Sequence, residues 1–167
     1  MTTYHGKLIA RNKKFGIVVS RFNEYITGRL LDGALLTLKK AGIPEKNIHV
    51  VWVPGGLEVP FFCKKLKSQT RCDVVIALSC VIRGGTYHFE CVANELTRGI
   101  DQVALETGTP IATGVITADN LEQAIDRAGL KAGNKGEQAA LVALEIVSLD
   151  QQLTRGKKKS TRSQKRT

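Results

Sequence analysis

The sequence predicts an α/β protein in which a central four-stranded parallel sheet lies between two layers of helices. Four short apolar runs rich in β-branched residues alternate with amphipathic stretches along the 167 residues. Each run is almost continuously apolar, which is typical of parallel strands buried on both faces. Because the crossovers between parallel strands are right-handed, the helices are expected to cover both faces. The result is a three-layer α/β/α sandwich of the flavodoxin-like type.

The first half of the chain contains two of these strands. Phe15–Ser20 is apolar and β-branched, and the helix after it keeps leucines at helical spacing until Gly42 and Pro44 end it. The second strand is Ile48–Val53, and a short helix that reaches about Ser68 follows it.

The second half contains the other two strands and the helix that we expect to be the longest. The third strand covers 73–79, the long helix covers 86–106, and the fourth strand covers 110–117. A short helix capped by Asn120 and a final helix over 135–151 complete the fold.

Positive charge is concentrated at the C-terminal end. The formal net charge is +10, and seven positive charges lie after residue 154, so that without them the net charge would be +3. This segment has no acidic or apolar side chain, and it is expected to be disordered because it cannot bury a core. We therefore predict one folded domain over 1–153 with a basic tail over 154–167, and nucleic acid is not an expected partner.

The cysteines and the apolar runs indicate a cytoplasmic protein. No Cys-x-x-Cys pair or histidine spacing suggests a metal site, so reduced thiols are expected at Cys63, Cys72, Cys80 and Cys91. No apolar run approaches the roughly 20 residues of a membrane span. The first residues also lack the apolar region of a signal peptide. We expect neither a membrane partner nor a metal.

The stretch from Ser79 to Cys91, SCVIRGGTYHFEC, combines an anion-binding geometry with a proton-transfer group. A buried strand leads through two glycines into a helix, whose first N–H groups have no intrahelical partner and favour negative charge. Thr86 adds a hydroxyl, and His88 can move protons near neutral pH. The plainer interpretation is an ordinary glycine-containing loop with a surface histidine, and this segment alone does not decide between the two.

Other strand ends bring further groups to this loop, because ligands of such sheets bind beyond the carboxyl ends of the strands. Phe22 and Asn23 follow the first strand, and residues 55–58 follow the second. Each group also has a structural explanation: Phe22 as core, Glu58 as a favourable charge in a first helical turn, and Arg127 as a cation near a helix end. Their convergence on one rim favours a ligand site.

Taken in this order, the motifs of the chain resemble those of the lumazine synthase family over about residues 4–149. The motifs that carry the resemblance are SRFN (20–23), PGGLEVP (54–60), VIRGGTYHFE (81–90), GVIT (114–117), NLEQA (120–124), RAG (127–129) and KAGNKG (131–136). The family acts in riboflavin biosynthesis. It condenses 5-amino-6-(D-ribitylamino)uracil with 3,4-dihydroxy-2-butanone 4-phosphate to 6,7-dimethyl-8-ribityllumazine, and it releases phosphate and water.

The resemblance implies a role for each residue of the site. His88 would transfer protons, and Phe22 would stack on the pyrimidine ring. The other substrate-binding residues that it implies are Asn23, Gly56, Leu57 and Glu58 for the ribityl chain and ring edges, Val81, Ile82 and Thr113 beside the ring, and Gly85, Thr86 and Arg127 for the phosphate. Two of them depart from the family pattern, since many relatives have an acidic residue in place of Gly85 and a phenylalanine in place of Thr113. No cofactor is implied, because the substrate amine attacks the ketone itself and the remaining steps are proton transfers.

The resemblance also implies a homo-oligomer. The family's sites lie between adjacent subunits of a pentamer, and Arg127 and the segment around Thr113 come from the neighbour. Residues 7–10 are expected to form a small extra strand that covers a neighbour's sheet edge. The short connection over 129–136 is similar to that of relatives whose pentamers close into an icosahedral shell. Riboflavin synthase is a further candidate partner.

Two other kinds of protein share some of these features. A flavodoxin-like nucleotide-binding module would have the same sheet and phosphate loop, but it gives no reason for the pairing of His88 with Arg127. A noncatalytic relative could keep the fold as a binding or shell-forming protein. Selective binding of a ribitylaminopyrimidine would exclude the first alternative, and turnover of the two purified substrates would exclude the second.

Overall fold

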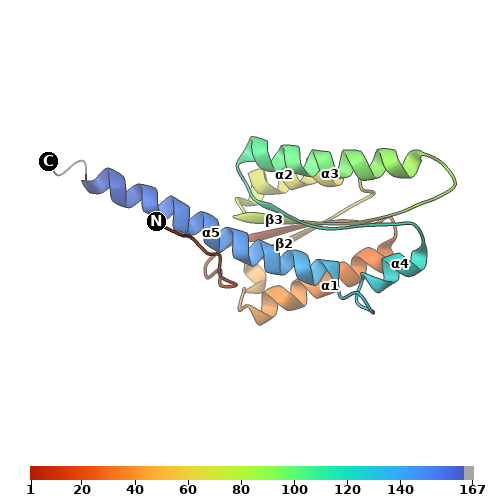
Figure 1. Ribbon diagram of the computed structural model, residues 1–167, viewed down its shortest axis with the longest axis horizontal. Helices are drawn as coiled ribbons and strands as arrows, with labels where there is room; N and C mark the ends of the chain where they lie inside the picture. The colour runs from red at the N-terminus through yellow and green to blue at the C-terminus, as the bar shows by residue number, and fades with distance from the viewer. Residues whose placement is uncertain (164–167) are drawn as a thin grey trace.

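A parallel four-stranded sheet forms the centre of the computed structural model, which describes residues 1–163 (Figure 1). The strand order is β2-β1-β3-β4, and all neighbouring strands pair in parallel. The strands are β1 (Phe15–Ser20), β2 (Ile48–Val53), β3 (Val74–Ile82) and β4 (Ile111–Ala118).

Helices cover both faces of this sheet. They are α1 (Glu24–Lys40), α2 (Val59–Thr70), α3 (His88–Thr107), α4 (Leu121–Asp126) and α5 (Lys135–Ser163), with a short 3₁₀ helix, η1 (Glu45–Asn47), before β2. In Figure 1 the sheet lies between α2 and α3 on one side and α1, α4 and α5 on the other. The predicted three-layer α/β/α sandwich is therefore confirmed.

The central strands are buried on both faces, which explains their continuous apolar runs. In β1, Ile17 and Val19 pack into the core beside α1 and α5, whereas Val18 packs into the core beside α2 and α3. In β3, Ile76 and Val75 alternate between the same two cores. Because each buried aliphatic side chain stabilises the fold by roughly 1.5–3 kcal/mol, burial on both faces holds these strands in the centre of the sheet.

Strand β3 continues past the end that the sequence predicted at Ser79. Val81 pairs with Thr117 and Ile82 pairs with Ala118, so β3 remains in the sheet as far as β4 does. The polar Ser79 resembles a strand end when the sequence is taken alone. The pairing with β4 is a tertiary contact, and it overrides that local signal.

Helix α5 is longer than predicted. It has 29 residues against 20 for α3, so α3 is not the longest helix, and α5 passes the predicted end near residue 151. Lysine and arginine are good helix formers, and an existing helix is extended without a new nucleus. The backbone of the basic segment is helical as far as Ser163, and residues 164–167 lie outside the described residues. The separation of this segment from the folded domain as a tail stays a prediction.

The N-terminal arm lies along α5 and contains no strand over residues 7–10 (Figure 1). The Lys7 backbone N–H donates to Ser148 Oγ at 3.2 Å, and Gln152 Nε2 donates to the His5 carbonyl at 2.7 Å. The predicted extra strand is therefore wrong for the single chain, in which the arm packs on a helix. Pairing of this arm with a neighbour's sheet stays a prediction.

One asparagine fixes the turn between α4 and α5. Asn134 Nδ2 donates to the carbonyls of Arg29 at 2.9 Å and Ala128 at 3.3 Å, and its Oδ1 accepts from the Gly136 N–H at 2.8 Å. A Cβ at Gly136 would lie 1.8 Å from the Leu30 carbonyl oxygen, so only glycine permits this approach of α5 to α1. Arg127 is tied to this turn directly, because the Lys135 backbone N–H donates to the Arg127 carbonyl at 2.9 Å.

The four thiols are free, as predicted from their spacing: Cys63, Cys72, Cys80 and Cys91. In the part of the chain that the structure describes, no helix combines the length and the apolar character that a membrane crossing requires.

Candidate active site

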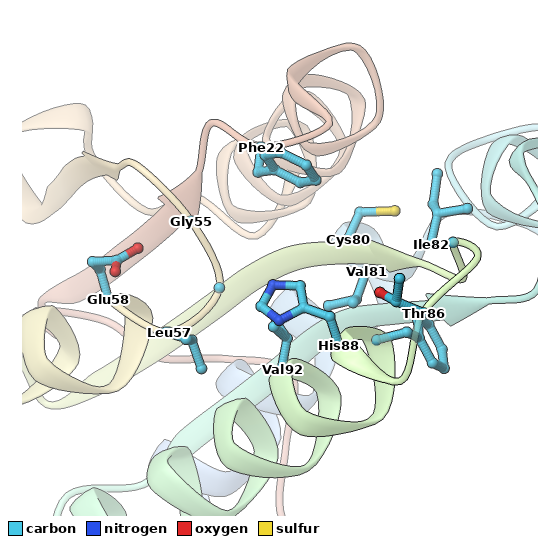
Figure 2. Close-up of a pocket in the computed structure, with 13 residues that line it drawn as sticks. Phe22, Gly55, Leu57, Glu58, Cys80, Val81, Ile82, Thr86, His88 and Val92 are labelled. Atoms are coloured by element: carbon cyan, nitrogen blue, oxygen red, sulfur yellow. The ribbon is translucent and has the colours of Figure 1, made fainter.

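A cavity of about 360 Å³ opens beyond the carboxyl ends of β1, β2 and β3, next to the start of α3 (Figure 2). Its lining comes from three strand-to-helix junctions and comprises Phe22, Gly55, Gly56, Leu57, Glu58, Cys80, Val81, Ile82, Gly84, Thr86, His88, Phe89 and Val92. Ligands of parallel α/β sheets bind at this edge. The volume suits a small organic molecule.

Phe22 is held between two strands. Its backbone N–H donates to the Pro54 carbonyl at 3.0 Å, beyond the end of β2. The next residue, Asn23, has φ 60° and donates from Nδ2 to the Cys80 carbonyl on β3 at 3.0 Å. Asparagine is one of the few non-glycine residues that adopt this left-handed conformation readily. The Phe22 ring is 70% exposed and borders the cavity, so one face is free for an aromatic ligand.

Neutral hydrogen bonds lie beneath this part of the cavity. Ser20 Oγ and Ser79 Oγ are 2.9 Å apart and buried, and they join β1 to β3. The buried Thr27 hydroxyl donates to the Ser20 carbonyl at 2.7 Å and ties α1 to the end of β1. Because buried polar groups are costly to leave unpaired, these bonds define one arrangement of the strand ends.

The loop between β2 and α2 approaches the cavity with its backbone exposed. A Cβ at Gly56 would lie 3.3 Å from a Leu96 methyl carbon and 3.4 Å from Ser79 Oγ, so glycine lets the loop lie close to α3 and β3. A Cβ at Gly55 would lie 3.0 Å from a carboxylate oxygen of Glu58. This loop can therefore offer backbone groups and one carboxylate to a ligand that carries hydroxyl groups.

The opposite side of the cavity is formed by the start of α3. His88 is the first residue of this helix, and Thr86 and Gly84 precede it in the loop from β3. In Figure 2, Phe22 lies on one side of Cys80 and Val81, and His88 lies on the other side. A Cβ at Gly84 would meet no atom within 4 Å, so the loop stands open toward solvent. The N–H groups at the start of a 20-residue helix favour an anion here.

Arg83 connects this side to β4. Its Nε donates to Asp119 Oδ1 at 2.9 Å, its guanidinium forms an ion pair with Glu90, and its Cζ lies 4.4 Å from the centre of the Phe89 ring. The hydrogen bond from Arg83 lowers the pKa of the Glu90 carboxyl, and the hydrogen bonds to Asp119 and Glu90 raise the pKa of Arg83. A second cavity of about 450 Å³ lies on this side, and Phe89 borders both cavities.

The structure brings eight of the residues predicted for the site to one cavity: Phe22, Gly56, Leu57, Glu58, Val81, Ile82, Thr86 and His88. Asn23 is adjacent, but its side-chain amide binds the Cys80 carbonyl. Gly85 is next to the lining residues Gly84 and Thr86 without being one of them.

Arg127 and Thr113 do not line the cavity of the single chain. Arg127 follows the last turn of α4, where its guanidinium donates to the Gln123 carbonyl at 3.2 Å. Thr113 is exposed on β4, the strand at one edge of the sheet. Both side chains are accessible at the surface.

Sequence reasoning missed three lining residues, Cys80, Phe89 and Val92, whereas Gly55 and Gly84 were expected beside the ligand as glycines of the two loops. Helical spacing could have identified Val92, which lies four positions after His88 on the same helix. For Cys80 the sequence predicted only a reduced thiol. Burial raises the pKa of its thiol to about 12, so it borders the cavity as a neutral, weakly polar group.

The fold and the cavity define a class of protein: α/β/α sandwiches that bind a small polar ligand at the carboxyl edge of a parallel sheet. A family model described as 6,7-dimethyl-8-ribityllumazine synthase matches residues 12–151. The chain therefore belongs to the 6,7-dimethyl-8-ribityllumazine synthase family, and the resemblance found in its motifs is confirmed. Membership implies an enzyme of riboflavin biosynthesis with a transferase-type reaction.

Two solved structures show a weaker likeness. A GDP-L-fucose synthetase from Naegleria fowleri is 14% identical with a TM-score of 0.40, and the match covers 85% of this chain and 44% of that chain. The same enzyme bound to NADP is 14% identical with a TM-score of 0.41, and the match covers 97% of this chain and 53% of that one. The chain spans about half the length of these structures. Likenesses at this level carry no argument about this protein.

Proposed function

We propose that this protein condenses 5-amino-6-(D-ribitylamino)uracil with 3,4-dihydroxy-2-butanone 4-phosphate to 6,7-dimethyl-8-ribityllumazine. One observation carries the proposal: an exposed aromatic face, a glycine loop and a histidine at a helix start border the same cavity of about 360 Å³. These groups match a flat ring, a polyhydroxyl chain and a phosphate. Family membership supports the same reaction.

The pyrimidine occupies the side of the cavity that Phe22 forms. The ring stacks on the exposed face of Phe22, and Val81 and Ile82 provide the apolar wall beside it. The ribityl hydroxyls bind backbone groups of residues 56–58 and the Glu58 carboxylate. Asn23 contributes indirectly, because its amide is already bound to the Cys80 carbonyl and holds Phe22 in place.

The phosphate of the second substrate binds at the start of α3. The N–H groups that follow Gly85 and the Thr86 hydroxyl face an anion there, and the helix dipole adds a favourable field. Arg127 of a neighbouring subunit supplies the compensating positive charge, since arginine binds phosphate through two parallel hydrogen bonds.

The reaction then needs positioning and proton transfer. The primary amine of the pyrimidine attacks the ketone carbon, and loss of water gives an imine. The C–O bond to phosphate breaks next, and the phosphate leaves with the electron pair. The C3 proton is lost with the phosphate, which leaves an enol that tautomerises to a new ketone at C3. The ribitylamino nitrogen then closes the second ring on this C3 ketone with loss of water. His88, exposed at the cavity, moves protons between these steps.

A complete site requires a neighbour, because neither Arg127 nor Thr113 lines the cavity of one chain. We therefore propose a pentamer in the cytoplasm with the sites between adjacent subunits. The short connection between α4 and α5 supports closure of pentamers into an icosahedral shell, in which riboflavin synthase is a candidate partner. Light scattering and negative-stain microscopy test the assembly, and an active monomer would contradict the shared site.

Turnover of the two purified substrates, followed by the absorbance of the lumazine product, tests the proposal. We expect saturable turnover with both substrates and binding of the pyrimidine without the phosphate. FMN serves as the competitor in the binding experiment. A protein that binds FMN and not the ribitylaminopyrimidine would be a nucleotide-binding module. Pyrimidine binding without turnover would identify a noncatalytic relative.

A further inference from the structure

Arg83 lies outside the cavity, yet it holds three of the segments that shape the cavity and its surroundings. We propose that Arg83 is a positioning residue, which keeps the start of α3 in place so that Thr86 and His88 face the phosphate-bearing substrate before it binds. This inference rests on the proposed function. It assigns Arg83 a role in the site that is distinct from substrate contact.

The contacts of Arg83 reach across the sheet edge. Its backbone N–H donates to the Ala118 carbonyl at 2.9 Å, and its Nε donates to Asp119 Oδ1 at 2.9 Å. The guanidinium also pairs with Glu90, which lies in the first turn of α3. One side chain therefore ties the end of β3, the end of β4 and the first turn of α3 together.

Phe89 transmits this arrangement to the cavity. The guanidinium carbon of Arg83 lies 4.4 Å from the centre of the Phe89 ring, which is a cation–π distance. Phe89 borders the candidate active site on one side and the second cavity, which Arg83, Glu90 and Asp119 also border, on the other. His88 directly precedes Phe89 at the start of α3, so a shift of the backbone that carries Phe89 also shifts His88.

The charges around Arg83 argue against direct binding of phosphate. Two carboxylates, Asp119 and Glu90, already bind the guanidinium and balance its charge. The planar guanidinium suits this arrangement, because it can hold two carboxylates and stack on a ring at the same time. A lysine in its place could not hold the two carboxylates in this fixed planar geometry and could not stack on the ring in the same way.

Four variants test the proposal in the full-length protein: Arg83→Gln, Arg83→Lys, Glu90→Gln and, as the matched control, Arg98→Gln. Arg98 is an exposed arginine on α3, and it forms an ion pair with Glu95 at 4.0 Å. The control therefore also removes one arginine charge, at a residue that does not line the cavity. Circular dichroism and melting temperature establish that each variant is folded.

We expect Arg83→Gln to raise the KM for the butanone phosphate about tenfold over the Arg98→Gln control, because two exposed ion pairs and one cation–π contact are lost. Arg83→Lys should raise this KM by a smaller factor than Arg83→Gln. The Kd for the pyrimidine should change by less than about twofold, since Phe22 is held by other contacts.

Glu90→Gln separates positioning from direct contact. If Arg83 positions the helix, loss of the Glu90 charge weakens the arrangement and raises the KM for the phosphate substrate. If Arg83 binds the phosphate itself, the same change frees its guanidinium and lowers that KM. The proposal would be overturned by a lower KM for the butanone phosphate in Glu90→Gln. It would also be overturned if Arg83→Gln and Arg98→Gln had the same KM for this substrate.

Amide hydrogen exchange supplies a readout that needs no substrate. We expect faster exchange over residues 84–90 in Arg83→Gln than in Arg98→Gln. Equal exchange would show that Arg83 does not hold this segment, whatever the kinetics. If the unmodified protein shows no turnover, the proposed reaction fails, and the exchange comparison still decides whether Arg83 holds the start of α3.

Discussion

The two sides of the cavity are held in place by different chemistry. On the Phe22 side, the strand ends are joined by neutral and largely buried hydrogen bonds, such as those between Ser20 and Ser79 and from Asn23 to the Cys80 carbonyl. On the His88 side, the first turn of α3 is joined to β4 by the ion pairs of Arg83, whose side chain is 43% exposed.

This difference matches what each side is proposed to bind. A stacking platform for a neutral ring works best when it is rigid, and buried neutral bonds are insensitive to salt and pH. A site for a charged group that must enter and leave benefits from exposed ion pairs, which are weaker and can rearrange. The comparison predicts that the two sides respond differently to mutation and to solution conditions.

His88→Ala should produce the largest effect on turnover. General acid–base assistance contributes roughly 10²- to 10⁴-fold to a rate, and activity should remain measurable because the two substrates still meet. His5→Ala is the matched control, since His5 is exposed on the N-terminal arm. Single-turnover kinetics measure the effect. Unchanged kinetics in His88→Ala would remove this residue from the mechanism and leave the His88 side as a binding surface only.

Arg127→Ala tests whether a third contribution comes from a neighbour. A charge-assisted hydrogen bond is worth about 1.5–3 kcal/mol, so affinity for the butanone phosphate should fall roughly ten- to a hundredfold. Pyrimidine affinity should change much less. Mixing Arg127→Ala subunits with His88→Ala subunits should restore some intact sites at shared interfaces. Equal loss of both affinities would show that Arg127 organises the whole pocket.

Ser20→Ala should destabilise the Phe22 side by about 1–3 kcal/mol, because it leaves the buried Ser79 hydroxyl without its partner. Chemical denaturation of the assembled protein measures the change. The Ser20→Ala/Ser79→Ala double variant should lose less than the sum of the two single variants, since both partners are then removed. Strict additivity would mean that the hydroxyl pair does not hold the strand ends.

The contacts on the His88 side of the cavity should respond to low pH, whereas the hydrogen bonds on the Phe22 side should not. Arg83 lowers the pKa of Glu90 from 4.5, so the stabilisation from this pair is complete above pH 4.5 and is lost as pH falls through the lower value in the folded protein. The stability difference between the unmodified protein and Glu90→Gln should therefore be constant above pH 4.5 and shrink below it. The difference for Ser20→Ala should not change over this range.

The sequence predicts the fold well where a signal is local. The bounds of β1 and β2 follow from nearly continuous apolar runs, and the structure gives the same bounds. The predicted end of β3 was wrong, because the last residues of this strand are held in the sheet through their pairing with β4. The predicted end of α5 was wrong because lysine and arginine are good helix formers that extend an existing helix without a new nucleus, although their composition alone resembles a tail.

The residues of the site can likewise be predicted from the sequence only where a local motif marks them. His88 and Thr86 were found because a glycine loop before a helix is a local motif. Arg83 lies within that motif, yet its partner Asp119 is 36 residues away, and no local pattern connects the two. Contacts of this kind depend on which loops meet at the sheet edge. Predicting them therefore requires the strand order of the sheet to be known.

Phe89 borders two cavities at once, and this restricts how the protein can change over evolution. A smaller side chain would enlarge both spaces, and a larger one would fill both. An adaptation of the site to a different ligand therefore cannot use this position without a second change beside Arg83. A substitution at Phe89 should be accompanied by a second substitution beside Arg83. A scan of single substitutions at Phe89 would therefore underestimate the number of sequences that the site can accept.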